Sequence, residues 1–259
     1  MSSTASAAPF PQASPGSRFY LWMAAAYLVI AFGGFTPSYW APVIRSRFEG
    51  GFIVHVHGLL LFSWTVLFFV QSALVAGRRV ASHRSWGLAG ISLFTLLMCS
   101  ILLTQSMVLK RDAAAGFELQ ALRFSAVTLI SWPIIGTLFV LAMANIARPE
   151  RHKRYMTLLM INMMTPALAR LVILAVSLLG PAGAGPGAPP PPFVAIVPGL
   201  IGSLLLLAAL LHDRRTRGSV HPVYRWGGLV TFFYPASAAV IGSTDGWVAF
   251  ARGLEHLAG

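Results

Sequence analysis

The residues best suited to chemistry in this sequence are its seven histidines, which stand beside only seven Asp and Glu residues. Neutral imidazole is a common ligand of iron, copper and zinc, and it also supplies axial ligands to haem. Two of the histidines, His55 and His57, lie in the string HVHGLLLFSWTVLFFVQ. On a helix their side chains point roughly 160° apart. One helix alone therefore cannot direct both imidazoles at one small ion.

Spacing within the same string is more informative. His57, Trp64 and Gln71 follow one another at intervals of seven residues, which places them on nearly one stripe of a helix. Polar groups within a bilayer usually face the interior of a helix bundle. We therefore expect this stripe to face the interior, with His57 as its candidate ligand.

Four further histidines, His83, His152, His212 and His221, lie close to basic residues at the ends of apolar segments. Imidazoles that meet at one membrane face could hold a b-type haem or a transition-metal ion. The alternative is that basic loops simply include histidine. The predicted metal ligands are His57, His83, His152, His212 and His221.

Arg170 is the only formal charge well inside a predicted span, and no Asp or Glu lies within any of the predicted spans. An intramembrane arginine needs an anion, a carbonyl or water as its partner. Its partner could be the carboxylate, phosphate or haem propionate of a ligand. The alternatives are carbonyls released by Pro166 or a water pocket reached by snorkelling.

Missing residues and motifs exclude several classes of protein. A carboxylate proton relay needs Asp or Glu within the spans, and a retinal Schiff base needs a lysine in the last span; neither is present. The sequence also lacks GxSxG, HExxH, P-loop and GxGxxG motifs. The single cysteine, Cys99, excludes a disulfide framework.

The composition predicts the elements that must position these residues. Charged residues make up 10% of the chain and hydrophobic residues 56%, whereas about a quarter of the residues in a soluble domain are charged. Backbone groups in lipid must be satisfied within helices or closed barrels, and the apolar segments lack the alternation of barrel strands. We therefore expect an all-α membrane protein.

Seven segments are close to the length of about 20 residues that crosses a bilayer. They run from Phe19 to Phe35, Phe52 to Ala76, Trp86 to Leu109, Leu122 to Ala147, Tyr155 to Leu179, Phe193 to Leu211 and Tyr224 to Ile241.

The basic residues gather on one side of these segments. The positive-inside rule then predicts a cytoplasmic N-terminus and an external C-terminus, and it explains the net charge of +12 without nucleic acid. The predicted cytoplasmic residues are Arg18, Arg78, Arg79, Arg84, Arg148, Arg151, Lys153, Arg154, Arg214, Arg215, Arg217 and Arg225. The predicted external ones are Arg45, Arg47, Lys110, Arg111, Arg123 and Arg252.

The predicted organisation has three parts. Residues 1–17 form a disordered cytoplasmic tail rich in Ser, Ala and Pro, residues 18–247 form the seven-helix domain, and residues 248–259 form a short external tail. Within the domain, the Gly- and Pro-rich segment 180–192 is expected to be an external linker or a cover over an outward-facing cavity.

Several short motifs resemble a family of uncharacterised bacterial multi-pass membrane proteins. They are His57 through Trp64 and Gln71, then His83-Arg84 to Gly87, His152 to Met156, and Ala169-Arg170-Leu171. More distantly, the helix entries are similar to membrane families linked to the assembly of haem-copper oxidases. The resemblance implies cofactor-binding roles for His57, Trp64, Gln71, His83, Arg84, His152, Arg154 and Arg170.

The leading hypothesis is a haem- or metal-associated protein of the bacterial inner membrane that acts in electron transfer or respiratory-complex assembly. The first alternative is a transporter or receptor for a small organic anion, with His57 and Arg170 lining its pocket. The second is a scaffold without catalytic activity that binds other membrane proteins through small-residue faces around Gly87, Gly90 and Gly136.

Overall fold

The computed structural model describes residues 16–179 and 189–258, and this part of the chain is entirely helical apart from its connections. The helices are α1 (Gly16–Phe35), the π-helix η1 (Thr36–Trp40), α2 (Ala41–Ile44), α3 (Phe52–Ala76), α4 (Val80–Ala114), α5 (Glu118–Ala144), α6 (Pro149–Leu179), the 3₁₀ helix η2 (Pro192–Ala195), α7 (Ile196–Arg217), α8 (Pro222–Gly242) and α9 (Asp245–Ala258).

Among the described residues, six helical stretches are long and apolar enough to cross a membrane. The prediction of a helical multi-pass membrane protein is therefore confirmed. The seventh predicted span corresponds to α8, which packs against α5, α6 and α7 but is not among the six. Its composition is less apolar, because Arg225, Pro235 and several Gly and Ser residues interrupt the run.

Three long helices extend beyond the predicted spans. At 35 residues, α4 is about 50 Å long. The others are α6, which begins at Pro149, and α7, which ends at Arg217, so Glu150 and Asp213 lie within helical spans. The predicted spans themselves contain no Asp or Glu, because Glu150 and Asp213 lie in the polar helix ends beyond the apolar runs.

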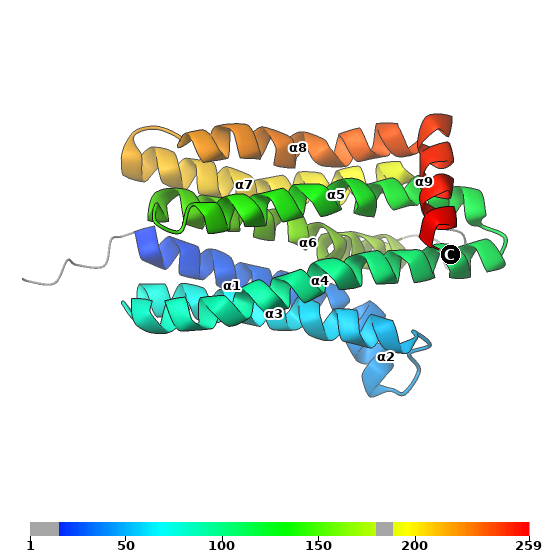
Figure 1. Ribbon diagram of the computed structural model, residues 1–259, viewed down its shortest axis with the longest axis horizontal. Helices are drawn as coiled ribbons and strands as arrows, with labels where there is room; N and C mark the ends of the chain where they lie inside the picture. Colours follow the sequence, from blue (N-terminus) through cyan, green and yellow to red (C-terminus); the bar gives the residue numbers. More distant parts are fainter. Residues whose placement is uncertain (1–15, 180–188, 259) are drawn as a thin grey trace, which may run out of the picture.

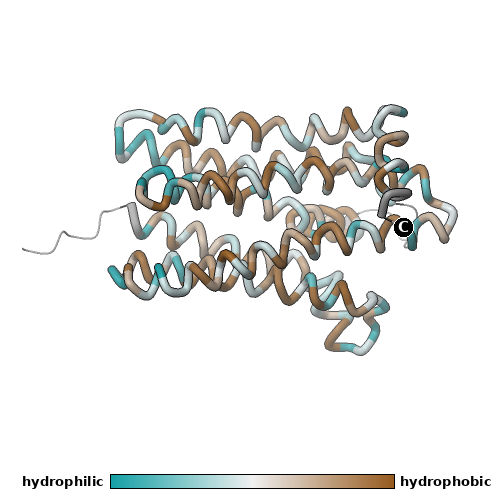
Figure 2. The backbone as a smooth tube through the Cα atoms, viewed as in Figure 1, coloured by the Kyte–Doolittle hydropathy of each residue, from teal (hydrophilic) through white to brown (hydrophobic). Residues whose placement is uncertain are grey.

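The long helices lie side by side, with the α3–α4, α5–α6 and α7–α8 connections at one end of the bundle (Figure 1). Hydrophilic residues gather at this end (Figure 2), which we call the basic end. At the opposite end lie α2 and α9, and α9 crosses the direction of the long helices (Figure 1).

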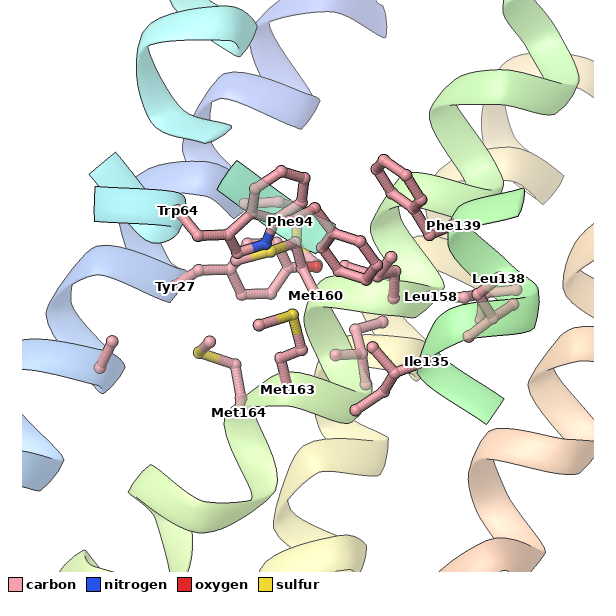
Figure 3. Close-up of a cluster of buried hydrophobic side chains, with 14 of the residues drawn as sticks. Tyr27, Trp64, Phe94, Ile135, Leu138, Phe139, Leu158, Met160, Met163 and Met164 are labelled. Atoms are coloured by element: carbon pink, nitrogen blue, oxygen red, sulfur yellow. The ribbon is translucent and has the colours of Figure 1, made fainter. Parts of the chain in front are cut away.

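The middle of the bundle is an apolar core of aromatic and methionine side chains. Trp64, Tyr27 and Phe94 gather beside Met160 and Met163 (Figure 3). The rings of Phe94 and Phe139 stack with centroids 3.9 Å apart, and Trp64 lies 4.9 Å from Phe94. Stacked and edge-on aromatic pairs of this kind stabilise helix packing.

The last helix, α9, is amphipathic and packs against the start of α5. Val248 and Ala251 are buried against Leu122, and the Trp247 indole N–H donates to the Leu122 carbonyl at 2.9 Å. This helix falls in the stretch predicted as a short external tail. The predicted cytoplasmic tail lies outside the described residues up to residue 15, as does 180–188 of the predicted linker.

Candidate functional site

At the basic end, the fold brings together two of the predicted metal ligands, His83 and His152. His83 lies in the first turn of α4 and His152 in the first turn of α6, and their ring centroids are 6.4 Å apart. Two imidazoles whose nitrogens lie about 2 Å from one shared ion have ring centres roughly 5 Å apart at a tetrahedral angle and roughly 6.5 Å apart when they lie opposite each other. The pair is therefore close to a ligand spacing.

Hydrogen bonding leaves both rings with a nitrogen free for a metal. His152 uses Nδ1 to contact the Ala142 carbonyl oxygen at 2.9 Å, so a neutral His152 carries its proton there and keeps a lone pair on Nε2. A backbone carbonyl often orients a metal-binding histidine in this way. The Nδ1 atom of His83 is buried and has no hydrogen-bond partner.

Gln71 lies beside His83. Its backbone is next to the His83 ring, and its side-chain amide nitrogen is 3.8 Å from the position of a Cβ built on Gly87. Its amide oxygen is buried without a hydrogen-bond partner, which leaves an oxygen ligand available. Arg84, the neighbouring predicted cofactor residue, is exposed.

The other two histidines of the basic end have separate partners. His212 stacks on Phe19 with ring centroids 3.9 Å apart. His221 caps α8, because its Nδ1 accepts the Val223 N–H at 3.1 Å, and a neutral His221 therefore carries its proton on Nε2. Burial lowers the pKa of His221, and the nearby positive charges of Arg154 and Arg217 lower it further.

Among the described residues, no three His, Cys, Asp or Glu side chains lie close enough to hold one metal ion. The five predicted metal ligands thus do not form a single cluster. His83 and His152 form one pair, while His57, His212 and His221 are placed elsewhere.

The most deeply buried polar feature of the basic end is an ion pair between Arg154 and Asp213. These two side chains are 2% and 0% exposed, and the Arg154 Nε atom is 3.1 Å from each oxygen of the Asp213 carboxylate. A second guanidinium nitrogen of Arg154 also contacts the carboxylate. The His221 backbone N–H donates to Asp213 Oδ2 at 2.9 Å, so the carboxylate joins α6, α7 and the start of α8.

Glu150 extends this pair into a network. Its carboxylate accepts from Arg154 Nη1 at 2.7 Å and from Lys153 Nζ at 2.6 Å, and Arg217 approaches it at 3.2 Å. Arg154 therefore has carboxylate partners within the chain, although the sequence predicted a cofactor-binding role for it. Because Glu150 and Asp213 lay outside the predicted spans, sequence reasoning missed both partners.

Three tyrosines surround the inner side of this network. The Tyr224 ring lies below the Arg154 guanidinium, 5.6 Å from centroid to Cζ. The hydroxyl oxygens of Tyr20, Tyr27 and Tyr224 are buried without hydrogen-bond partners. These residues could have been identified from the sequence, because a tyrosine inside a predicted span places a hydroxyl in an apolar setting.

Nearer the opposite end, His57 contacts α4. Its Nδ1 is 2.9 Å from Ser100 Oγ, and that hydroxyl donates to the Leu97 carbonyl at 2.7 Å. The His57 Nδ1–H therefore donates to Ser100, which leaves a lone pair on Nε2. His55, two residues earlier, bonds instead to the Tyr39 hydroxyl at 3.0 Å, so the two imidazoles have different partners, as the helix geometry predicted.

The partners of Arg170 come from the chain itself. Its Nε donates to Ser38 Oγ at 3.1 Å, its Nη1 donates to the Pro166 carbonyl at 2.9 Å, and its Cζ lies 4.1 Å from the centre of the Phe35 ring. One of these partners is a backbone carbonyl, but it is that of Pro166 and not that of Asn162, which is the carbonyl that the proline leaves without an N–H donor. Among the described residues, no carboxylate pairs with Arg170.

His57 and Arg170 are neighbours in the fold without being bonded to each other. The charge of Arg170 is close enough to act on His57, but their hydrogen bonds go to different helices. The role of this pair in an anion-binding pocket stays a prediction.

No known protein family, curated protein or solved structure matches the chain. The resemblance to a family of bacterial membrane proteins therefore stays a prediction, and function must be argued from the site.

Proposed function

We propose that this chain is an inner-membrane protein that binds one transition-metal ion at its basic end, through Nδ1 of His83 and Nε2 of His152. The observation that carries the proposal is the 6.4 Å distance between the centroids of these two rings. It is supported by the hydrogen bond of His152 to a backbone carbonyl and by the His83 nitrogen that has no hydrogen-bond partner. The unpartnered amide oxygen of Gln71 is the third ligand.

The ligand types favour a first-row transition metal. Imidazole nitrogen suits copper, zinc and iron, whereas calcium and magnesium prefer sites built from oxygen ligands. A copper or iron ion supplies a one-electron centre when bound, which accords with a role in electron transfer or in the assembly of a respiratory complex. The chain's own contribution is to orient both imidazoles from the first turns of α4 and α6.

A single ion suits these residues better than haem. Haem carries two propionates, and Arg154 was among the residues predicted to bind a cofactor. Its guanidinium is instead taken up by Asp213 and Glu150. Removing it from these partners would leave a buried carboxylate unpaired, at a cost of about 3–5 kcal/mol.

The proposal includes seven spans and a cytoplasmic N-terminus. Because α8 lies beside α5 and α7 along the bundle (Figure 1), we count it as the seventh span. The α3–α4, α5–α6 and α7–α8 connections and their flanking helix ends contain most of the arginines, so the positive-inside rule assigns the basic end to the cytoplasm.

Metal content of the purified protein tests the proposal. The protein is purified in detergent with an affinity tag that contains no histidine, incubated separately with copper, zinc and iron salts, desalted and measured by elemental mass spectrometry. We expect about one equivalent of one metal, with loss of most of it in His83→Ala and in His152→Ala. His212→Ala is the matched control, because His212 lies at the same end but stacks on Phe19.

Two results would overturn the proposal. One is a wild-type protein without stoichiometric metal after all three incubations. The other is equal loss of metal in His212→Ala and His83→Ala, which would indicate non-specific binding. A Soret band in the absorbance spectrum of the purified protein would indicate that the site binds haem and not a single metal ion.

A further inference from the structure

A groove opens on the surface of the bundle between α5, α6 and α8. Its volume is about 550 Å³. The wall from α5 runs from Pro133 to Leu141, and the wall from α8 runs from Pro222 to Val230. At 1.5 Å per residue each wall is about 12 Å long.

The two ends of the groove differ in chemistry. Arg151 and His221 line its mouth at the basic end, where α6 and α8 begin. Farther along, the lining residues are apolar apart from the hydroxyl groups of Thr137 and Tyr155. They include Ile134, Leu138 and Val230. A positively charged mouth above an apolar wall complements an anionic headgroup followed by an acyl chain.

Arg151 is available for such a headgroup. The side chain is exposed, and it forms no ion pair with the described carboxylates. Its neighbours Lys153 and Arg154 are both engaged by Glu150. At the same level, the neutral His221 ring keeps its Nε2–H as a donor, because its Nδ1 caps α8.

The length of the groove indicates which kind of ligand fits it. A wall of about 12 Å is close to the hydrocarbon thickness of one leaflet, which is about 15 Å, or half of a 30 Å core. A transmembrane helix of a partner protein crosses both leaflets and would need a face about twice as long. Trp226, which is 73% exposed, lines the groove on the α8 side.

We propose that this groove is a binding site for one anionic glycerophospholipid of the leaflet at the basic end, with its phosphate at Arg151 and His221 and one acyl chain between α5 and α8. The site is independent of the proposed metal site. Pro133 lies within α5 and Gly227 within α8, and both line the groove.

Native mass spectrometry tests this site. The protein is reconstituted into nanodiscs of equal parts dioleoyl-phosphatidylglycerol and dioleoyl-phosphatidylcholine, and the lipids retained after release are counted. We expect one retained phosphatidylglycerol, with a preference of about fivefold over phosphatidylcholine, since one basic residue near a membrane surface contributes about 1 kcal/mol. Arg151→Gln should remove the preference, and Thr137→Trp should reduce retention of both lipids by filling the groove.

Arg214→Gln is the matched control, because Arg214 is an exposed arginine of α7 at the same end and does not line the groove. It should leave the preference unchanged. The inference is wrong if Arg214→Gln weakens the preference as much as Arg151→Gln does, or if Thr137→Trp retains as much phosphatidylglycerol as the wild type. Crosslinking of a Thr137→Cys variant to another protein chain through the new thiol would also contradict it. The metal content of these variants should stay at the wild-type value. The lipid-site proposal can therefore be wrong while the metal-site proposal holds, and the reverse.

Discussion

At the basic end Arg154 is paired with Asp213 and Glu150, whereas toward the opposite end Arg170 meets only a hydroxyl, a carbonyl and an aromatic ring. Both are arginines of the same helix, sixteen residues apart. The difference shows two ways of holding a cation within a helix bundle. One uses buried opposite charge and joins three helices, and the other uses neutral dipoles at the edge of the bundle.

The comparison predicts unequal costs for removing the two arginines. Arg154→Ala should destabilise the protein by about 3–5 kcal/mol, because it leaves Asp213 buried and unpaired. The loss can be measured from unfolding curves in detergent, followed by circular dichroism. Replacing both partners, as Arg154→Met with Asp213→Leu, should restore much of the stability, since no charge then remains buried. A loss below about 1 kcal/mol in the single variant would show that Asp213 finds another partner.

A second prediction concerns the contact between α1 and α6, which brings Arg170 close to Ser38 and Phe35. A side chain at Gly34 would overlap the backbone carbonyl of Ala167, whereas one at Gly33 would meet nothing within 4 Å. Gly34→Ala should therefore cost about 1–3 kcal/mol by forcing the helices apart. Gly33→Ala should be neutral or stabilising by up to about 1 kcal/mol, because alanine is the better helix former. Equal effects in the same unfolding assay would mean that α1 and α6 are not this close.

Arg170→Met should have a smaller effect, about 1–2 kcal/mol. It removes two hydrogen bonds to neutral groups but leaves no charge behind, and hydrogen bonds between membrane helices are individually weak. Its unfolding curve should be compared with that of Arg154→Ala under the same conditions. A loss as large as that of Arg154→Ala would contradict the difference between the two regions, because it would indicate an anion bound at Arg170.

The smallest expected effect is a dependence on pH at the start of α8. The pKa of His221 is lowered in the folded protein, mainly by burial, so the folded state binds fewer protons than the unfolded state. Its contribution to stability is therefore present above the unfolded pKa of about 6.5 and is lost as the pH falls through the lower folded value. Melting temperatures at pH 7.5 and pH 5.5 should differ less in His221→Asn, because asparagine caps a helix without titrating. If the difference between the two melting temperatures is the same in His221→Asn as in the wild type, titration of His221 does not contribute to the pH dependence of stability.

Much of the fold could be predicted from the sequence, because a membrane span needs only a long apolar run. The helical class and six spans are confirmed. The prediction erred where helices continue into polar sequence. Asp213 looked like a loop residue since it follows Leu211 and precedes two arginines, yet it is fully buried because Arg154 neutralises it. A hydropathy scale cannot predict the burial of Asp213, since it gives every charged residue the same value whether or not that residue forms an ion pair.

The candidate site was only partly predictable. His83 and His152 were singled out by residue type, and the first turns of α4 and α6 meet because both helices begin at the same end of the bundle. Which histidines would pair could not be predicted, because His212 and His221 occupy equivalent positions in sequence but face Phe19 and the start of α8. The partners of Arg170 depend on the π-helix after α1, which places Ser38 beside α6.

The helix α9, which crosses the direction of the long helices, affects which bilayer thickness suits the protein. It is fixed to α5 by the bond from Trp247 and by Arg252, whose Nη2 lies 2.8 Å from the Glu118 carboxylate, while Phe250 stays exposed. An amphipathic helix of this kind rests at the interface between lipid and water. Its distance from the arginines of the basic end then sets one preferred hydrocarbon thickness. A thinner or thicker bilayer must deform or tilt the protein at a cost that rises with each ångström of hydrophobic mismatch.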